Sequence, residues 1–157
     1  MTSETSRFDE QMIHQAVTLA LTNADKGGEP FGAVLTRGTE IVAEGVNDAH
    51  IDHDLTAHAE IQALRHAGKA QRQASHTGTT MYASGKPCAM CMAAMIQAGV
   101  ARIVFAADDD LGGPYGFSTE SLYRQMQGNF GHQGIDVVHL PHPESREAFE
   151  RYQALLG

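Results

Sequence analysis

The stretch TTMYASGKPCAMCMAAMIQAGVARIVFA, residues 79–106, decides the fold that we predict for this chain. It begins with a short strand at Thr79–Ala83 and continues with a strongly apolar helix at Cys88–Ala98. Gly99 ends that helix, since glycine is the usual residue just past a helix C-terminus. A second strand follows at Arg102–Ala106. The order strand, helix, strand favours the α/β class, in which helices cover a sheet.

The segments on either side continue this alternation of helices and strands. Before residue 79, the patterns predict a helix at Arg7–Asp25, a hairpin of two strands at Phe31–Thr36 and Ile41–Val46, a loop at Asn47–Asp54 and a helix at Ala57–Gly68. After residue 106, they predict a loop at Asp108–Gly116, a helix at Thr119–Gln127, a last strand at Ile135–Leu140 and a helix at Glu144–Leu156. We therefore expect a single domain over residues 1–157, with a mixed five-stranded sheet and helices on both faces.

Composition and charge exclude some classes of function and disfavour others. No apolar run approaches the length of about eighteen residues that a membrane span needs, and Met1–Glu10 is polar and acidic, unlike a secretory signal. We therefore expect a cytoplasmic protein without a membrane partner. The net charge of −8 disfavours a nucleic-acid partner, because an acidic surface repels phosphates.

The two cysteines, Cys88 and Cys91, indicate metal or redox chemistry rather than a structural disulfide. Their spacing of three places both thiols on one side of the first helical turn, and Pro87 suits a helix start. The positive end of the helix favours thiolate, the form that binds zinc. With His58 as a third ligand, the set leaves one tetrahedral position for water, which is typical of catalytic zinc.

Glu60, two residues after His58, is the candidate proton carrier. Residues at i and i+2 do not share a helix face, so Glu60 would lie beside the metal-activated water without binding the metal. It could take the water proton and deliver it to a leaving group. Two alternatives remain open: a redox pair of cysteines, or a structural zinc site that borrows His50, His53 or His66. A non-catalytic zinc-binding module for assembly is a further alternative.

These motifs resemble the cytidine deaminase-like superfamily, in which zinc deaminases of nucleobases share a His-x-Glu and a Pro-Cys-x-x-Cys signature. The similarity rests on four features: Gly28–Val34 (GEPFGAV), Asn47, Thr56–Ile61 (TAHAEI) and Lys86–Cys91 (KPCAMC). It is closest in motif to bacterial guanine deaminases, and it extends to fungal cytosine deaminases and tRNA adenosine deaminases. The resemblance implies a three-layer α/β/α sandwich, a Zn²⁺ cofactor and a homodimer.

The resemblance also implies a role for each site residue. His58, Cys88 and Cys91 would hold zinc, and Glu60 would shuttle protons. Asn47 would bind the substrate ring through its amide, and the backbone around Ala59 would face the substrate; these two residues, with Phe31, form the candidate substrate-binding set. Phe31 would stack on the base or, alternatively, serve as a core residue of its strand.

The substrate is the least constrained part of the prediction. We expect a free nucleobase or nucleoside, and Pro30-Phe31-Gly32 slightly favours a guanine-like ring over a cytosine-like one. In guanine deaminases an acidic residue follows the Gly-Phe pair of the loop after the fourth strand, whereas here Ser118 follows Gly116-Phe117. The alternative is a tRNA adenosine deaminase, but Glu144–Leu156 lacks the basic, aromatic character of an RNA-gripping C-terminal helix.

Two further features have expected roles outside the chemistry. Asp108–Asp110 is either a solvated loop or part of an entrance that repels anions. The apolar helix at Cys88–Ala98 carries more methionines than one face needs, so we expect a second subunit to cover its outer face.

Overall fold

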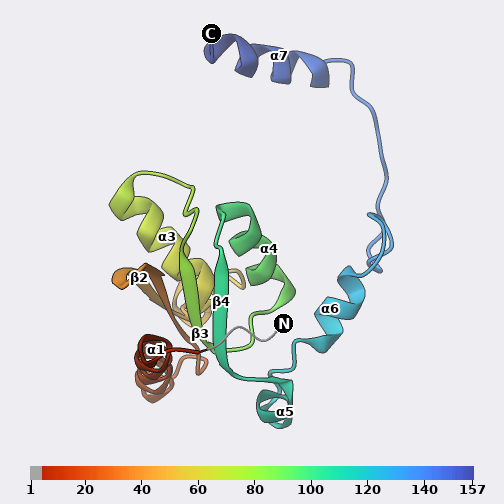
Figure 1. Ribbon diagram of the computed structural model, residues 1–157. Coiled ribbons are helices and arrows are strands. Elements are labelled where there is room, and N and C mark those ends of the chain that lie inside the picture. The colour runs from red at the N-terminus through yellow and green to blue at the C-terminus, as the bar shows by residue number, and fades with distance from the viewer. Residues whose placement is uncertain (1–4) are drawn as a thin grey trace. The chain divides into compact units, whose positions relative to one another are not determined.

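The computed structural model describes residues 5–157. The chain divides into two compact units, the first ending at Arg124 and the second comprising Gln125–Gly157, so the expected single domain stays a prediction. The elements, in chain order, are α1 (Arg7–Asp25), β1 (Gly32–Arg37), β2 (Glu40–Val46), α2 (Ala49–Asp52), α3 (Ala59–Gln71), β3 (Thr80–Gly85), α4 (Ala89–Ala98), β4 (Arg102–Ala107), α5 (Asp109–Gly112), a 3₁₀ turn (Gly113–Tyr115), α6 (Glu120–Met126) and α7 (Ser145–Leu155) (Figure 1).

The first unit is built on a mixed sheet with strand order β2-β1-β3-β4. β1 pairs antiparallel with both β2 and β3, and β3 pairs parallel with β4 across the crossover helix α4. A parallel pair needs such a crossover, which explains why the apolar segment at residues 89–98 lies between these two strands. The mixed α/β architecture that the sequence predicts is confirmed.

The two faces of the sheet bury different side chains, as strand alternation requires. On one face, Leu35 and Met81 pack with Ala63 of α3 and Met95 of α4. On the other face, the core consists of Val34 and Tyr82 with two residues of α1, Met12 and Ala16. The helices therefore form an outer layer on each side of the sheet, with α1 on one face and α3 and α4 on the other (Figure 1).

Local signals explain where the helices begin and end. α1 begins with a capping box, in which the Ser6 hydroxyl accepts from the Asp9 N–H and the Asp9 carboxylate accepts from the Ser6 N–H. The predicted end of α3 at Gly68 was too early. The helix continues to Gln71, and Arg72 ends it in the left-handed conformation while its N–H donates to the Gly68 carbonyl.

Two expectations about irregular segments were wrong. The loop expected at residues 108–116 contains α5 and a 3₁₀ turn, because the Asp108 carboxylate caps the first of them and Pro114 suits the start of the second. The loop expected at residues 47–54 contains the single turn α2.

The fifth strand, expected at Ile135–Leu140, is absent from the described residues, and the sheet has four strands. The alternating apolar pattern there is compatible with a strand, but a strand exists only where a neighbour supplies ladder hydrogen bonds. Within residues 125–157 no other strand offers that pairing, and Ile135, Val138 and Leu140 are exposed.

No helix between residue 5 and residue 157 is both long enough and apolar enough to cross a membrane.

Candidate active site

The two motifs start the two helices that pack on the same face of the sheet. His58 is the N-cap residue of α3 and Cys88 is the N-cap residue of α4, both with extended backbone and neither using its side chain to cap the helix. The imidazole and the thiol are therefore free to project from the two helix starts towards each other. Cys91 lies in the first turn of α4 and is fully buried.

These three residues form a group that is able to hold a metal ion. One ligand atom from each of His58, Cys88 and Cys91 lies within 4.8 Å of the others. The sulfur atoms of both cysteines are 3.6 Å from Nδ1 of His58. Two sulfurs and one imidazole nitrogen are donors that zinc prefers, and three protein ligands are typical of a catalytic site, so the donor set fits Zn²⁺.

The protonation of the cluster also fits a divalent cation. Hydrogen bonding from Cys91, with help from His58, lowers the pKa of Cys88 to about 4. The neighbouring Cys88 sulfur and burial raise the pKa of Cys91 above its ordinary range. The hydrogen bond with Cys88 raises the pKa of His58. Three close ligand atoms thus share protons that a bound zinc ion would displace.

Glu60 lies beside this cluster as the sequence predicts. It is buried in the first turn of α3, and its Oε2 accepts from the Cys91 thiol at 3.5 Å. Burial raises the pKa of the Glu60 carboxyl, so that it accepts a proton more readily than an exposed carboxylate does.

A cavity of about 620 Å³ opens next to the cluster and is lined by His58, Glu60 and Cys88. The predicted substrate residues Asn47 and Phe31 line it as well. Asn47, only 1% exposed, follows β2, and Phe31 precedes β1. Phe31 lines the cavity and also packs against the core cluster that includes residues of α3 and α4. Its stacking on a base stays a prediction.

Ala59 is not among the residues that line the cavity. It is the first residue of α3, its side chain is buried in the core, and its carbonyl oxygen approaches Gly45 so closely that a Cβ at that glycine would lie 2.2 Å away. The expected contact between the Ala59 backbone and substrate stays a prediction.

A second part of the cavity lining comes from residues 107–122, and several of its side chains have no role predicted from the sequence. Phe117 packs edge-to-face on Phe31, with ring centroids 5.1 Å apart. Four of the cavity-lining residues are apolar or aromatic and exposed: Leu55, Leu111, Tyr115 and Leu122. The sequence signal for this part of the lining is Gly116-Phe117-Ser118, where the chain departs from the guanine deaminase motif.

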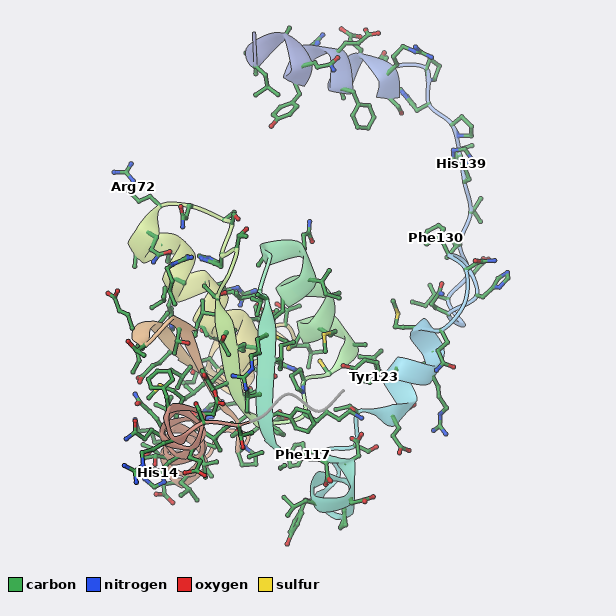
Figure 2. The ribbon with its side chains drawn as sticks, in the orientation of Figure 1. His14, Arg72, Phe117, Tyr123, Phe130 and His139 are labelled. Atoms are coloured by element: carbon green, nitrogen blue, oxygen red, sulfur yellow. The ribbon has the colours of Figure 1, made fainter. Side chains whose placement is uncertain are left out.

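A polar network joins this part of the lining to the start of α4. Lys86 forms an ion pair with Asp109 at 2.5 Å, and the same carboxylate accepts from the N–H and hydroxyl of Thr119. Tyr123 on α6 is directed back towards α4, and its hydroxyl donates to the Pro87 carbonyl at 2.6 Å (Figure 2). Of the acidic run, Asp108 caps α5 and Asp109 pairs with Lys86, and both line the cavity.

Comparison with known proteins agrees with this site. The model of the cytidine and deoxycytidylate deaminase zinc-binding region matches residues 6–107. A tRNA-specific adenosine deaminase of Buchnera aphidicola is 38% identical over 99 residues, which cover 63% of this chain and 61% of that protein. A guanine deaminase of Bacillus subtilis is 35% identical over 118 residues, covering 74% of this chain and 76% of that protein.

Among solved structures, that of guanine deaminase from Bacillus subtilis aligns with a TM-score of 0.84 and 29% identity, over 96% of this chain and 95% of the other. The chain belongs to the zinc-binding cytidine and deoxycytidylate deaminase family. It is a deaminase, a hydrolase of C–N bonds, with zinc as the family's metal.

Proposed function

We propose that this enzyme hydrolyses the exocyclic C–NH₂ bond of a free nucleobase or nucleoside, with a guanine-like ring favoured over a cytosine-like one. Water and substrate give the ring carbonyl and ammonia. The observation that carries the proposal is a largely apolar cavity, large enough for a ring, with Glu60, His58 and Cys88 in its wall and Cys91 beside them. The structural likeness to a guanine deaminase over nearly the whole chain supports the choice of ring.

The protein's part in this chemistry is to move protons. His58, Cys88 and Cys91 would hold zinc, which would supply activation of the attacking water. Glu60 would take one proton from that water and pass it to the ring nitrogen beside the reacting carbon. It would then take the second proton from the hydroxyl added to that carbon and deliver it to the departing amine. Burial of Glu60 next to the Cys91 sulfur supports this role, because a desolvated carboxylate accepts a proton more readily than an exposed one.

Three residues of this chain would hold the ring. The Asn47 amide would hydrogen-bond to it, since an amide offers both a donor and an acceptor. Phe31, held edge-on by Phe117, would pack against its face. The backbone around Ala59 would contribute a further contact.

The charges of the cavity favour an uncharged substrate over a phosphorylated one. Among the described lining residues Lys86 is the single lysine or arginine, and Asp109 engages it. Four carboxylates share the lining: Glu29, Glu60, Asp108 and Asp109. A substrate phosphate would therefore meet repulsion from these carboxylates, and the lining lysine already pairs with Asp109.

The second candidate function is deamination of adenosine in tRNA. The likeness to a curated tRNA-specific adenosine deaminase supports it, at an identity similar to that of the guanine deaminase. The net charge of −8 counts against it, because RNA binding depends on neutralising phosphates.

We also propose a homodimer and a cytoplasmic location, and one functional domain over residues 1–157.

The test is ammonia release by the zinc-loaded protein from guanine, cytosine, isocytosine, adenine, pterins, the corresponding nucleosides and an adenosine-containing anticodon stem-loop. We expect release from one or more free bases or nucleosides. Glu60→Gln should keep the zinc and abolish release, whereas the exposed Glu40→Gln should match wild type. Release from the stem-loop alone would select the second candidate, and no release from any compound by zinc-loaded protein would contradict the proposal.

A further inference from the structure

The side-chain amide of Asn47 is held at both ends. Its Nδ2 donates to Oε2 of Glu29 at 2.8 Å, and its Oδ1 accepts from the Ala49 N–H at 3.0 Å. A flip of the amide would place Oδ1 against a carboxylate and Nδ2 against an N–H donor. Both contacts would become repulsive, so together they fix which end of the amide is the donor.

Glu29 is itself held in place by the end of α1. Asn23 is buried there, and its Nδ2 donates to the carbonyl oxygens of Glu29 at 2.8 Å and of Asn47 at 2.9 Å. The Asn23 carbonyl accepts from the Gly28 N–H. A Cβ at Gly28 would lie 2.5 Å from Asn23 Nδ2, so only glycine fits this approach. One asparagine thus joins the two segments that carry Glu29 and Asn47.

Glu29 and Asn47 differ in their access to solvent. Asn47 is almost fully buried, whereas Glu29 is exposed, and both line the cavity. A ligand in the cavity would therefore exclude water from the Glu29 carboxylate and strengthen its hydrogen bond to the Asn47 amide.

We propose that Glu29 is a positioning residue, which fixes the Asn47 amide so that its second N–H and second oxygen lone pair face the substrate. This role rests on the proposed function. An amide held in this way presents one donor beside one acceptor. It therefore selects a ring edge that carries an acceptor next to an N–H donor, and it discriminates against an edge with two acceptors.

A double-mutant cycle tests whether Glu29 acts through Asn47. On a base that wild type deaminates, Glu29→Gln should lower kcat/KM about 10- to 100-fold, mainly by raising KM, because glutamine can donate as well as accept and so permits the flip. Zinc content and Tm should not change. In the Asn47→Ala background, Glu29→Gln should have almost no further effect. Equal effects in both backgrounds, or a Glu29→Gln protein as active as wild type, would overturn the proposal.

A second measurement does not depend on activity. In ¹⁵N-edited NMR spectra, the side-chain NH₂ signals of Asn47 are assigned by their loss in Asn47→Ala. Glu29→Gln should shift them, whereas Glu40→Gln, a change at an exposed residue on the hairpin, should not. Signals unmoved by Glu29→Gln would refute the positioning role even in an active enzyme. If no compound releases ammonia although the Asn47 signals shift as expected, the proposed function is refuted and the positioning of Asn47 by Glu29 stands.

Discussion

The contact between Phe31 and Gly85 shows how the lack of one atom, the Cβ of residue 85, affects the shape of the cavity. The Phe31 ring lies over the end of β3, where a Cβ on Gly85 would come within 2.8 Å of the ring. The other side of Phe31 meets Phe117, so the ring has little room to move away. Glycine at position 85 therefore determines the position of the Phe31 ring in the cavity lining.

Gly85→Ala should displace Phe31 into the cavity and raise KM about 10-fold, with zinc content unchanged. Gly113→Ala is the matched control, since its added Cβ meets only Ser118, at 3.9 Å. Steady-state kinetics and metal analysis on both variants check this expectation. Equal KM values for Gly85→Ala and wild type would show that Phe31 does not border the bound substrate.

Prediction from sequence succeeded best where chemistry dictates residue type and spacing. Zinc needs sulfur and nitrogen ligands, so His58, Cys88 and Cys91 could be named, and their convergence is confirmed. The link from Asn47 to Glu29 could not be named, because a hydrogen bond between residues 18 apart in the chain leaves no periodic signal. The same limit applies to the contact between Phe31 and Phe117.

At the scale of elements, the segment from α5 to α6 depends on a network centred on Asp109. Its carboxylate ties Lys86, just before α4, to Thr119, just before α6. The hydrogen bonds with Lys86 and Thr119 keep the pKa of Asp109 below its ordinary value. This network explains how a segment rich in glycine and aspartate forms a defined wall, which its composition alone did not predict.

Asp109→Asn should loosen this wall, because an amide cannot replace the charge-assisted bond to Lys86. We expect faster amide hydrogen exchange in residues 109–119 and a KM raised several-fold, with α1 unaffected. Asp110→Asn, at an exposed neighbour, serves as control. Unchanged exchange in Asp109→Asn would show that the 3₁₀ turn and α5 hold the wall without the ion pair.

At the scale of the whole molecule, an ionic network joins the N-terminal helix to the sheet. Two Arg102 nitrogens donate to the buried Asp9 carboxylate, at 2.6 and 2.9 Å, and the Tyr82 hydroxyl donates to it at 2.6 Å. The hydrogen bonds from Arg102 and Tyr82 hold the pKa of Asp9 far below its ordinary range. Burial and the bond to Asp9 raise the pKa of Tyr82 to about 12.

A carboxyl whose pKa is lower in the folded state stabilises the fold above its unfolded pKa of about 4, and this contribution is lost as pH falls below that value. Asp9→Asn should therefore lower the free energy of unfolding by about 2 kcal/mol near neutral pH, with the difference from wild type shrinking towards pH 3. Urea unfolding at a series of pH values measures this, with the exposed Glu10→Gln as control. A difference that does not depend on pH would contradict the ionic role of Asp9.

The proposed homodimer makes a prediction about α4. Its outer face carries Ile96, which is 70% exposed in the single chain. If a second subunit covers this face, Ile96→Asp should shift the protein to a monomer in light scattering, because a buried charge without a partner is strongly unfavourable. Leu21→Asp, on α1 across the sheet, should leave the assembly unchanged. A wild-type monomer at micromolar concentration would contradict the dimer.

The order of apolar segments predicts the overall architecture, with one exception. That exception is the strand expected at residues 135–140, and its absence from the described residues has a physical reason. β3, α4 and β4 could be predicted because apolar residues of each pack in or against the cores of the first unit. Residues 135–140 carry a strand-like pattern, but a pattern describes only side chains, and strand formation depends on a backbone partner elsewhere.

The most direct test of the central claim compares kcat/KM for free guanine and for an adenosine-containing stem-loop RNA, with one zinc-loaded preparation at 50 and 200 mM salt. We predict that guanine, or another neutral base from the panel, is preferred by at least about tenfold, with little dependence on salt. Preference for the RNA, with kcat/KM that falls steeply as salt rises, would contradict it and would identify a phosphate-binding surface as the basis of substrate selection.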